Sequence, residues 1–136
     1  MTISPLRARS FAKINLLLSV LGRRADGYHD IQTVFQSIDL YDELEFKPSS
    51  RLELHCDSLA GLRPEDNLVW KAASLLLSHL PEKRGVSITL EKRIPAGAGL
   101  GGGSSNAAVT LLALRRFWNV GISDSVITRY LKVKEL

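Results

Sequence analysis

A glycine-rich segment limits what this chain can fold into more than any other feature: five of the seven residues from Gly97 to Gly103 are glycine. Because glycine has no Cβ, such a backbone reaches positive φ and lets a bulky group approach closely. Ser104, Ser105 and Asn106 follow, and they supply hydroxyl and helix-capping groups where an apolar helical pattern begins. Inward-facing N–H groups and the positive end of a helix attract anions, so the segment predicts a phosphate-binding loop.

The composition fits one globular domain. The chain has 136 residues, of which 45% are hydrophobic and 24% are charged, and these values are ordinary for a folded protein. Its net charge of +4 and pI near 9.5 suit an anionic partner, although solvated Lys and Arg side chains explain them equally well. A single cysteine, Cys56, excludes an intrachain disulfide and fits a reducing compartment. With no signal-like or membrane-spanning apolar run, we expect a cytoplasmic protein without a membrane partner.

The pattern of apolar residues predicts an α+β fold. We expect strands over residues 10–19 and 31–40, a hairpin of residues 44–46 with 51–55, and a strand over 86–90. We expect helices from Asp66 to a stop at Pro81, from about Ser105 to an end at Gly121, and from Ser123 onward. Strands first and helices interleaved later predict a two-layer α/β sandwich, in which helices cover one face of a mixed sheet.

Two polar side chains interrupt the first apolar strand. Lys13 and Asn15 lie two residues apart, so they share one face of a strand that otherwise reads as buried. An ammonium group in an apolar strand is costly unless an anion or hydrogen bonds compensate it. Downstream, an Asp26–Gly27 turn precedes Tyr28 and His29, whose aromatic face and imidazole can read a nucleobase by stacking and hydrogen bonding, or can simply pack.

Three known phosphate-loop motifs fit the glycine segment poorly. Gly97, Gly99 and Gly102 match G-x-G-x-x-G, but Pro95 lies in the connection from the preceding strand, and no acidic residue ends a strand about twenty residues later. A Walker A loop fails because Gly103 stands where its lysine belongs. The protein-kinase V-A-I-K, H-R-D and D-F-G patterns are absent from the sequence. A purely structural glycine turn, the remaining alternative, needs fewer glycines.

The segment from Pro95 to Ala108 instead resembles the motif P-x-x-x-G-L-G-x-S-S-x-A of the galactokinase, homoserine kinase, mevalonate kinase and phosphomevalonate kinase (GHMP) superfamily, with one extra glycine before the serines. Within this superfamily it is similar to the 4-diphosphocytidyl-2-C-methyl-D-erythritol kinases of the non-mevalonate (MEP) route to isoprenoids and terpenoids. Ala12-Lys-Ile-Asn-Leu16, Arg24-Ala-Asp-Gly-Tyr-His29 and Asp66-Asn-Leu68 match in the same order.

The resemblance implies an N-terminal GHMP kinase domain, related in shape to ribosomal-protein domains, and an ATP- and Mg²⁺-dependent phosphotransferase. Its small-molecule substrate would be 4-diphosphocytidyl-2-C-methyl-D-erythritol, phosphorylated on the 2-hydroxyl. Lys13 would be catalytic, beside that hydroxyl, while Asn15, Tyr28 and His29 would bind substrate, with Phe35 nearby. The residues implied to bind ATP are Pro95, Ala96, Gly97, Ala98, Gly99, Leu100, Gly101, Gly102, Gly103, Ser104, Ser105, Asn67, Leu68 and Lys92.

Alternatives remain for three of these residues. Asn67 would merely begin a helix, Leu68 would be a core residue, and Lys92 would be an exposed lysine at a strand end. No side-chain metal cluster is expected; a serine hydroxyl of the loop would lie close to Mg²⁺.

The resemblance further implies that residues 1–136 are a truncated N-terminal, ATP-binding domain. The family continues to a Gly-Ala-Asp segment, whose aspartate is the general base, and to a C-terminal domain, and neither has a counterpart in this sequence. Asp124 is the nearest acidic residue but matches no catalytic position. We therefore expect poor activity from the chain alone, since loss of a general base costs about 10²- to 10⁴-fold in rate.

A non-catalytic nucleotide- or RNA-binding module is the rival interpretation. It has little support, because no basic stretch with interleaved aromatic residues is present, and we expect no nucleic-acid partner.

Overall fold

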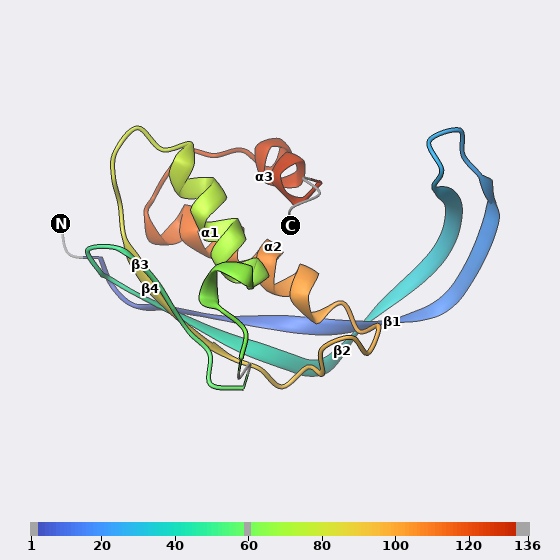
Figure 1. Cartoon of the computed structure of the whole chain (residues 1–136), viewed down its shortest axis with the longest axis horizontal. Helices are drawn as coiled ribbons and strands as arrows, with labels where there is room; N and C mark the ends of the chain where they lie inside the picture. Colours follow the sequence, from blue (N-terminus) through green and yellow to red (C-terminus); the bar gives the residue numbers. More distant parts are fainter. Residues whose placement is uncertain (1–2, 59–60, 133–136) are drawn as a thin grey trace.

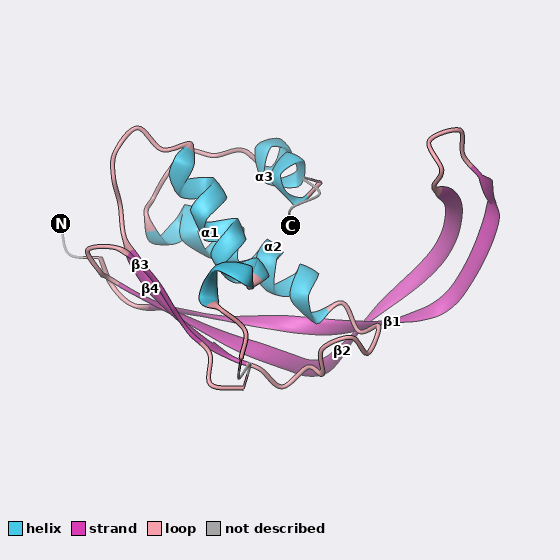
Figure 2. Cartoon of the chain, in the orientation of Figure 1, coloured by secondary structure: helices cyan, strands magenta, loops and turns pink. Residues whose placement is uncertain are grey.

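The computed structural model of the chain describes residues 3–58 and 61–132, which form one sheet with the helices gathered on one of its faces (Figure 2). This arrangement confirms the predicted α+β sandwich. The elements along the chain are β1 (Leu6–Arg23), β2 (His29–Lys47), β3 (Leu52–His55), the 3₁₀ turn η1 (Pro64–Asp66), α1 (Leu68–Ser78), β4 (Val86–Glu91), α2 (Gly102–Phe117) and α3 (Asp124–Leu131).

The sheet has the strand order β1-β2-β4-β3. β2 pairs antiparallel with both β1 and β4, whereas β3 pairs parallel with β4. The predicted hairpin of residues 44–46 with 51–55 is therefore wrong, because β4 arrives from later in the chain and occupies the place between β2 and β3. The predicted strands over 31–40 and 44–46 are a single strand, β2.

The core lies between the sheet and the helices. Along β2 and β4 every second side chain points to the face of the sheet that the helices cover. The apolar faces of α1 and α2 pack against these side chains. The residues that share this core and are no more than 2% exposed are Leu44, Phe46, Val69, Ala72, Ala73, Leu76, Val86, Ile88, Leu90, Ala107, Leu111 and Leu114.

The outer halves of β1 and β2 leave this core and form a two-stranded arm over residues 13–37. Figure 1 shows the arm curving toward the helix side of the sheet at a distance from the helices. The expectation of a buried strand over residues 10–19 is wrong for its second half, because Leu16, Leu17 and Leu18 are each more than half exposed. In Figure 1 no other strand or helix of the described residues lies beside the outer part of the arm.

Helix ends differ from the sequence expectations by a few residues. Asn67, and not Asp66, caps α1, because its Oδ1 accepts a hydrogen bond from Val69 N at 2.8 Å. α2 begins within the glycine segment at Gly102, three residues before the expected start at Ser105, and it ends before Gly121. Ser123 caps α3 as expected, accepting a hydrogen bond from the amide of Val126.

Leu111 and Leu112 are adjacent on α2 and offer a matched pair for testing this packing. Leu111 is fully buried, whereas Leu112 is 44% exposed. We expect Leu111→Ala to lower the free energy of unfolding by about 2–5 kcal/mol, because it leaves a cavity in the core. Leu112→Ala should change it by no more than about 0.5 kcal/mol. Urea unfolding followed by circular dichroism measures both, and equal effects would contradict this placement of α2.

Candidate functional site

The glycine segment lines a cavity of about 410 Å³ between the end of β4 and the start of α1. Pro95 to Ser104 form one wall, and Leu62, Asp66, Asn67, Leu68 and Lys92 complete it. The structure thus brings together most of the residues that the sequence singled out for nucleotide binding. Ser105 lies just outside this lining, and Asn67 serves both as the cap of α1 and as a wall of the cavity.

The glycines fall into two groups with different roles. Gly97 and Gly99 have φ of +71° and +74°, and a Cβ built on either meets nothing within 4 Å. They therefore shape an open backbone. Gly101 to Gly103 pack against the protein itself: a Cβ on Gly102 would lie 2.9 Å from Ile94 Cγ2, and one on Gly103 would lie 3.0 Å from Leu68.

The start of α2 also faces this cavity, since Gly102, Gly103 and Ser104 belong to both. The first N–H groups of a helix have no partner within the helix, and they carry its positive partial charge. The open glycine backbone and this helix end together suit an anionic group.

Lys13 contacts the glycine segment directly. A register shift between Phe11 and Lys13 re-aims the side chain, as β-bulges do. Lys13 N donates to Leu100 O at 3.0 Å, and Lys13 Nζ donates to Gly99 O at 3.2 Å and to Asn15 Oδ1 at 3.3 Å. The prediction that Lys13 and Asn15 share one face of the strand is confirmed. The positive charge of Lys13 is compensated by these hydrogen bonds and by the Phe35 ring, whose centre lies 5.2 Å from the ammonium.

A buried polar cluster lies beneath the glycine segment, and its central residue, Asp42, is not among the predicted site residues. Asp42 is fully buried and accepts hydrogen bonds from Lys92 Nζ at 2.6 Å, Arg93 N at 2.6 Å, Ile94 N at 2.8 Å and Asn106 Nδ2 at 2.9 Å. The alternative of an exposed strand-end lysine is wrong for Lys92, whose side chain is only 11% exposed.

Further hydrogen bonds connect this cluster to Ser105, at the end of the glycine-rich loop. Asn106 Nδ2 also donates to Ser10 Oγ at 2.9 Å, and Ser10 Oγ donates to Ser105 Oγ at 2.8 Å. Ser10 lies directly opposite Asp42 in the pairing of β1 with β2. The pairing of β1 with β2 therefore places Ser10 and Asp42 side by side, where both accept hydrogen bonds from Asn106.

The environment of Asp42 favours its charged form. Burial alone raises the pKa of this carboxyl, but the hydrogen bonds from the Ile94 amide, Lys92, the Arg93 amide and Asn106 together outweigh burial and hold the pKa below its ordinary value. Asp42 is thus a buried carboxylate balanced by the Lys92 ammonium.

The signal for Asp42 was present in the sequence. Glu43, Glu45 and Lys47 alternate with Leu44 and Phe46, so by the same period of two Asp42 falls on the apolar face. A charged residue on that face needs a partner.

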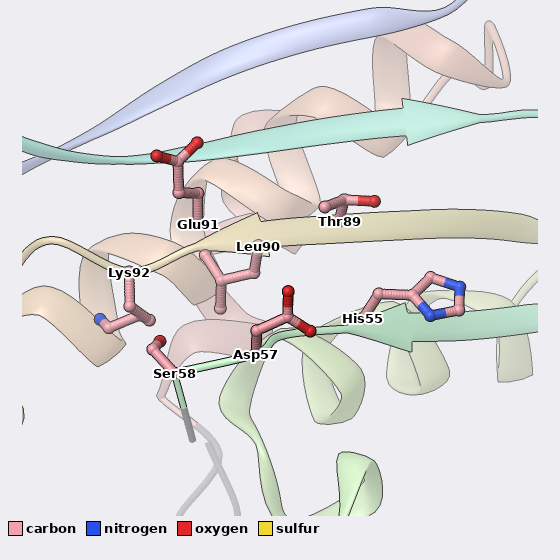
Figure 3. Close-up of a pocket in the computed structure, with 7 residues that line it drawn as sticks. All are labelled: His55, Asp57, Ser58, Thr89, Leu90, Glu91 and Lys92. Carbon is pink, nitrogen blue, oxygen red and sulfur yellow. The ribbon is translucent and has the colours of Figure 1, made fainter. Parts of the chain in front are cut away.

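A neighbouring hollow of about 300 Å³ lies on the other side of Lys92 (Figure 3). It is lined by His55, Asp57, Ser58, Thr89, Leu90, Glu91 and Lys92. Figure 3 shows the Lys92 nitrogen directed away from the carboxylates of Asp57 and Glu91. Among the described residues, no group of three or more His, Cys, Asp or Glu side chains is placed to hold a metal ion.

Two of the expected substrate residues lie away from the cavity. Tyr28 ends the turn at the tip of the arm and His29 begins β2, and both are exposed. The Asp26–Gly27 turn forms as expected, with Tyr28 N donating to Asp26 Oδ1 at 3.1 Å. Asp124 accepts a hydrogen bond from Arg115 at 2.5 Å, and Arg115 lies in the last turn of α2, at the opposite end of that helix from the glycine segment.

A mixed sheet with helices on one face, a helix that starts within a glycine-rich segment and a lysine bonded to that segment are the features that place the chain in a class. The chain belongs to the GHMP kinase family: the model of the GHMP kinases N terminal domain matches residues 67–135, half of its length.

Curated relatives give the same classification. The chain is 46% identical, over 92% of its length, to the 4-diphosphocytidyl-2-C-methyl-D-erythritol kinase of Acinetobacter baumannii, of which it covers 45%. It is 53% identical, over 88% of its length, to the enzyme of that name from Chlorobium limicola, of which it covers 41%. The chain therefore spans less than half the length of these relatives.

Solved structures agree with this comparison. A crystal structure of 4-(cytidine 5'-diphospho)-2C-methyl-D-erythritol kinase matches 96% of the chain with a TM-score of 0.80 and 43% identity, and the match covers 47% of that protein. A mevalonate kinase structure, 22% identical with a TM-score of 0.63, matches 93% of the chain and covers 45% of that protein; it shows the shared fold alone.

None of the helices within residues 3–58 and 61–132 combines the length and apolarity needed to cross a bilayer.

The charge state of Asp42 predicts a dependence of stability on pH. Because its folded-state pKa is lowered, its contribution to stability is complete above the ordinary value of 3.8 and is lost as the pH falls through the folded-state pKa. The free energy of unfolding should therefore fall on acidification below about pH 4, and this fall should be shallower in Asp42→Asn. Urea unfolding at several pH values measures both slopes, and parallel slopes would contradict the assignment.

Proposed function

We propose that this chain is the nucleotide-binding part of a cytoplasmic, ATP- and Mg²⁺-dependent kinase. The acceptor would be the 2-hydroxyl of 4-diphosphocytidyl-2-C-methyl-D-erythritol, the compound in the name of the relatives above. The observation that carries the proposal is a cavity lined by an open glycine backbone and the start of α2. The ammonium of Lys13 is bonded to Gly99 O of that backbone. Phosphoryl transfer depends mainly on positioning and on electrostatic stabilisation, which is what these groups supply.

The phosphates of ATP would occupy the cavity along Pro95 to Ser105. Gly97 and Gly99 have open space on the side where a Cβ would stand, so their backbone admits a bulky anion. Asn67 and Leu68, at the opposite wall, would lie near the adenine. Mg²⁺ neutralises the phosphates and is usually held through them and through few protein oxygens. Ser104 and Ser105 hydroxyls would contribute such oxygens.

Lys13 would position the acceptor hydroxyl and stabilise charge on the transferred group. Its ammonium has three N–H donors, and Gly99 O and Asn15 Oδ1 take two of them among the described residues. The third donor is available to a ligand at the edge of the glycine segment. Asn15, bonded to this ammonium, would hold the substrate beside it by its amide group.

The arm would carry the cytidine end of the acceptor. Tyr28 offers an exposed aromatic ring at the arm's turn, and His29 begins the strand that returns to the sheet. Stacking on such a ring does not depend on a deep pocket. A long substrate would then extend from the arm's turn to Lys13, with Phe35 beside the ammonium.

We further propose that the chain acts as an N-terminal domain. A further unit, equivalent to the part of the relatives that the chain does not cover, would complete the site. The matched relatives are more than twice as long as the aligned part. Four leucines of the arm are each more than half exposed to solvent: Leu16, Leu17, Leu18 and Leu21. A group of exposed apolar side chains like this one is normally covered by another structural unit. The general base would come from that unit, since Asp124 is bonded to Arg115.

Mg-ATP binding tests the site. Calorimetric titration of the chain should detect Mg-ATP, and Gly102→Val should weaken binding at least about tenfold, because its side chain would displace Ile94 and the first turn of α2. Gly121→Ala is the control, since a Cβ there meets nothing within 4 Å. Unchanged affinity in a folded Gly102→Val protein would contradict the proposed site.

The RNA-binding alternative gives a different result in the same experiment. It predicts salt-sensitive RNA binding without a preference for nucleotides, whereas the kinase predicts Mg-ATP binding and no comparable RNA binding.

Transfer of radiolabelled γ-phosphate to the cytidine substrate tests Lys13 in a complete version of the kinase, in which the chain is joined to the second half that its relatives have. Lys13→Met should lower the rate about 10²- to 10³-fold, as loss of a charge-stabilising donor does. The control is Lys47→Met, because Lys47 is an exposed lysine paired with Glu45 at the far end of β2. Equal rates in wild type and Lys13→Met would remove Lys13 from the mechanism.

A further inference from the structure

Asp42 joins the two ends of the glycine segment. On the side that precedes Pro95, its carboxylate accepts hydrogen bonds from the amides of Arg93 and Ile94 at 2.6 and 2.8 Å. On the side that follows Ser105, the same carboxylate accepts a hydrogen bond from Asn106 Nδ2 at 2.9 Å. A single buried side chain on β2, that of Asp42, is therefore hydrogen-bonded both to the residues before the loop and to the residue after it.

Lys92 supplies the charge that balances this carboxylate. Its ammonium lies 2.6 Å from Asp42 Oδ2 and 3.1 Å from Asn106 Oδ1. It turns away from Asp57 and Glu91, the carboxylates of the neighbouring hollow (Figure 3). An unpaired carboxylate beneath a phosphate site would repel the phosphates and would be costly to bury. Lys92 removes both penalties.

The same contacts fix how Asn106 is oriented. Its Oδ1 faces the ammonium of Lys92, and its Nδ2 faces the carboxylate of Asp42 and the hydroxyl of Ser10. A flipped amide would oppose donor to donor at Lys92 and acceptor to acceptor at Asp42. Asn106 lies in α2, one residue after Ser105, whose hydroxyl accepts a hydrogen bond from Ser10. The position of α2 against the loop is thereby tied to Asp42.

We propose that Asp42 is a positioning residue that holds the glycine segment in its anion-binding shape, with Lys92 acting as its counter-charge. Lys92 then serves the site through Asp42 and through the wall that its side chain adds to the cavity. Only the identity of the ligand, Mg-ATP, rests on the function proposed above. The shape of the empty loop is tested without any ligand.

Asp42→Asn is the central variant, because it keeps the side-chain volume and removes the charge. Lys92→Met and the double variant complete a cycle. The control is Glu45→Gln: Glu45 lies on the same strand but faces outward, where it pairs with Arg7 at 3.4 Å and Lys47 at 3.5 Å. Amide hydrogen exchange read by mass spectrometry reports on the loop without nucleotide, and calorimetry reports Mg-ATP affinity.

We expect Asp42→Asn to speed exchange at the amides of residues 96–105 by about tenfold, while exchange in α1 stays as in wild type and in Glu45→Gln. Mg-ATP affinity should fall by about the same factor although Lys92 is still present. The loss of Mg-ATP binding free energy in the double variant should be smaller than the sum of the losses in the two single variants, because both residues act through one contact.

Wild-type exchange of the loop in a folded Asp42→Asn protein would overturn the proposal. So would wild-type Mg-ATP affinity in Asp42→Asn combined with its loss in Lys92→Met, since Lys92 would then act on the nucleotide directly. Should Asp42→Asn not fold, the double variant, which leaves no lone buried charge, takes its place in the exchange comparison, and wild-type exchange of its loop would overturn the proposal. Should wild type not bind Mg-ATP, the kinase assignment fails, and the exchange comparison still decides the role of Asp42.

Discussion

The carboxylate of Asp42 is the point where the sheet, the glycine segment and α2 meet. It is fully buried, and a buried charge of this kind persists only when hydrogen bonds and a counter-ion replace the lost water. Its four donors come from the end of β4, from the connection to the loop and from α2. Several features of the site follow from this contact, including the partial burial of Lys92 and the fixed amide of Asn106.

The helix-covered core could be predicted from the sequence because it depends on local periodicity. Val86, Ile88 and Leu90 alternate along β4, and Val69, Ala72, Ala73 and Leu76 repeat along α1, and all are buried as expected. The strand order could not be predicted in the same way. Residues 52–55 follow β2 closely and read as its partner, but pairing with β4 is decided by contacts between residues far apart in the chain.

The site shows a similar division. The glycine motif predicted the loop, and period two predicted that Lys13 meets Asn15. The start of α2 was placed too late, because glycine at Gly102 and Gly103 reads as loop although the backbone there is helical. Asp42 was missed because its partners are separated from it by fifty residues or more, with the nearest at Lys92, and no local pattern joins them.

The place of β4 in the sheet has a consequence for the order in which the protein can form during synthesis. β1 and β2 are joined by a short turn and can pair as soon as both have left the ribosome. The inner edge of β2, however, has no partner until residues 86–91 have also emerged, and β3 must wait for the same segment. Until then the backbone N–H and C=O groups along this edge of β2 are unpaired, and such groups can pair with other chains. A nascent chain paused before residue 86 therefore exposes this edge of β2.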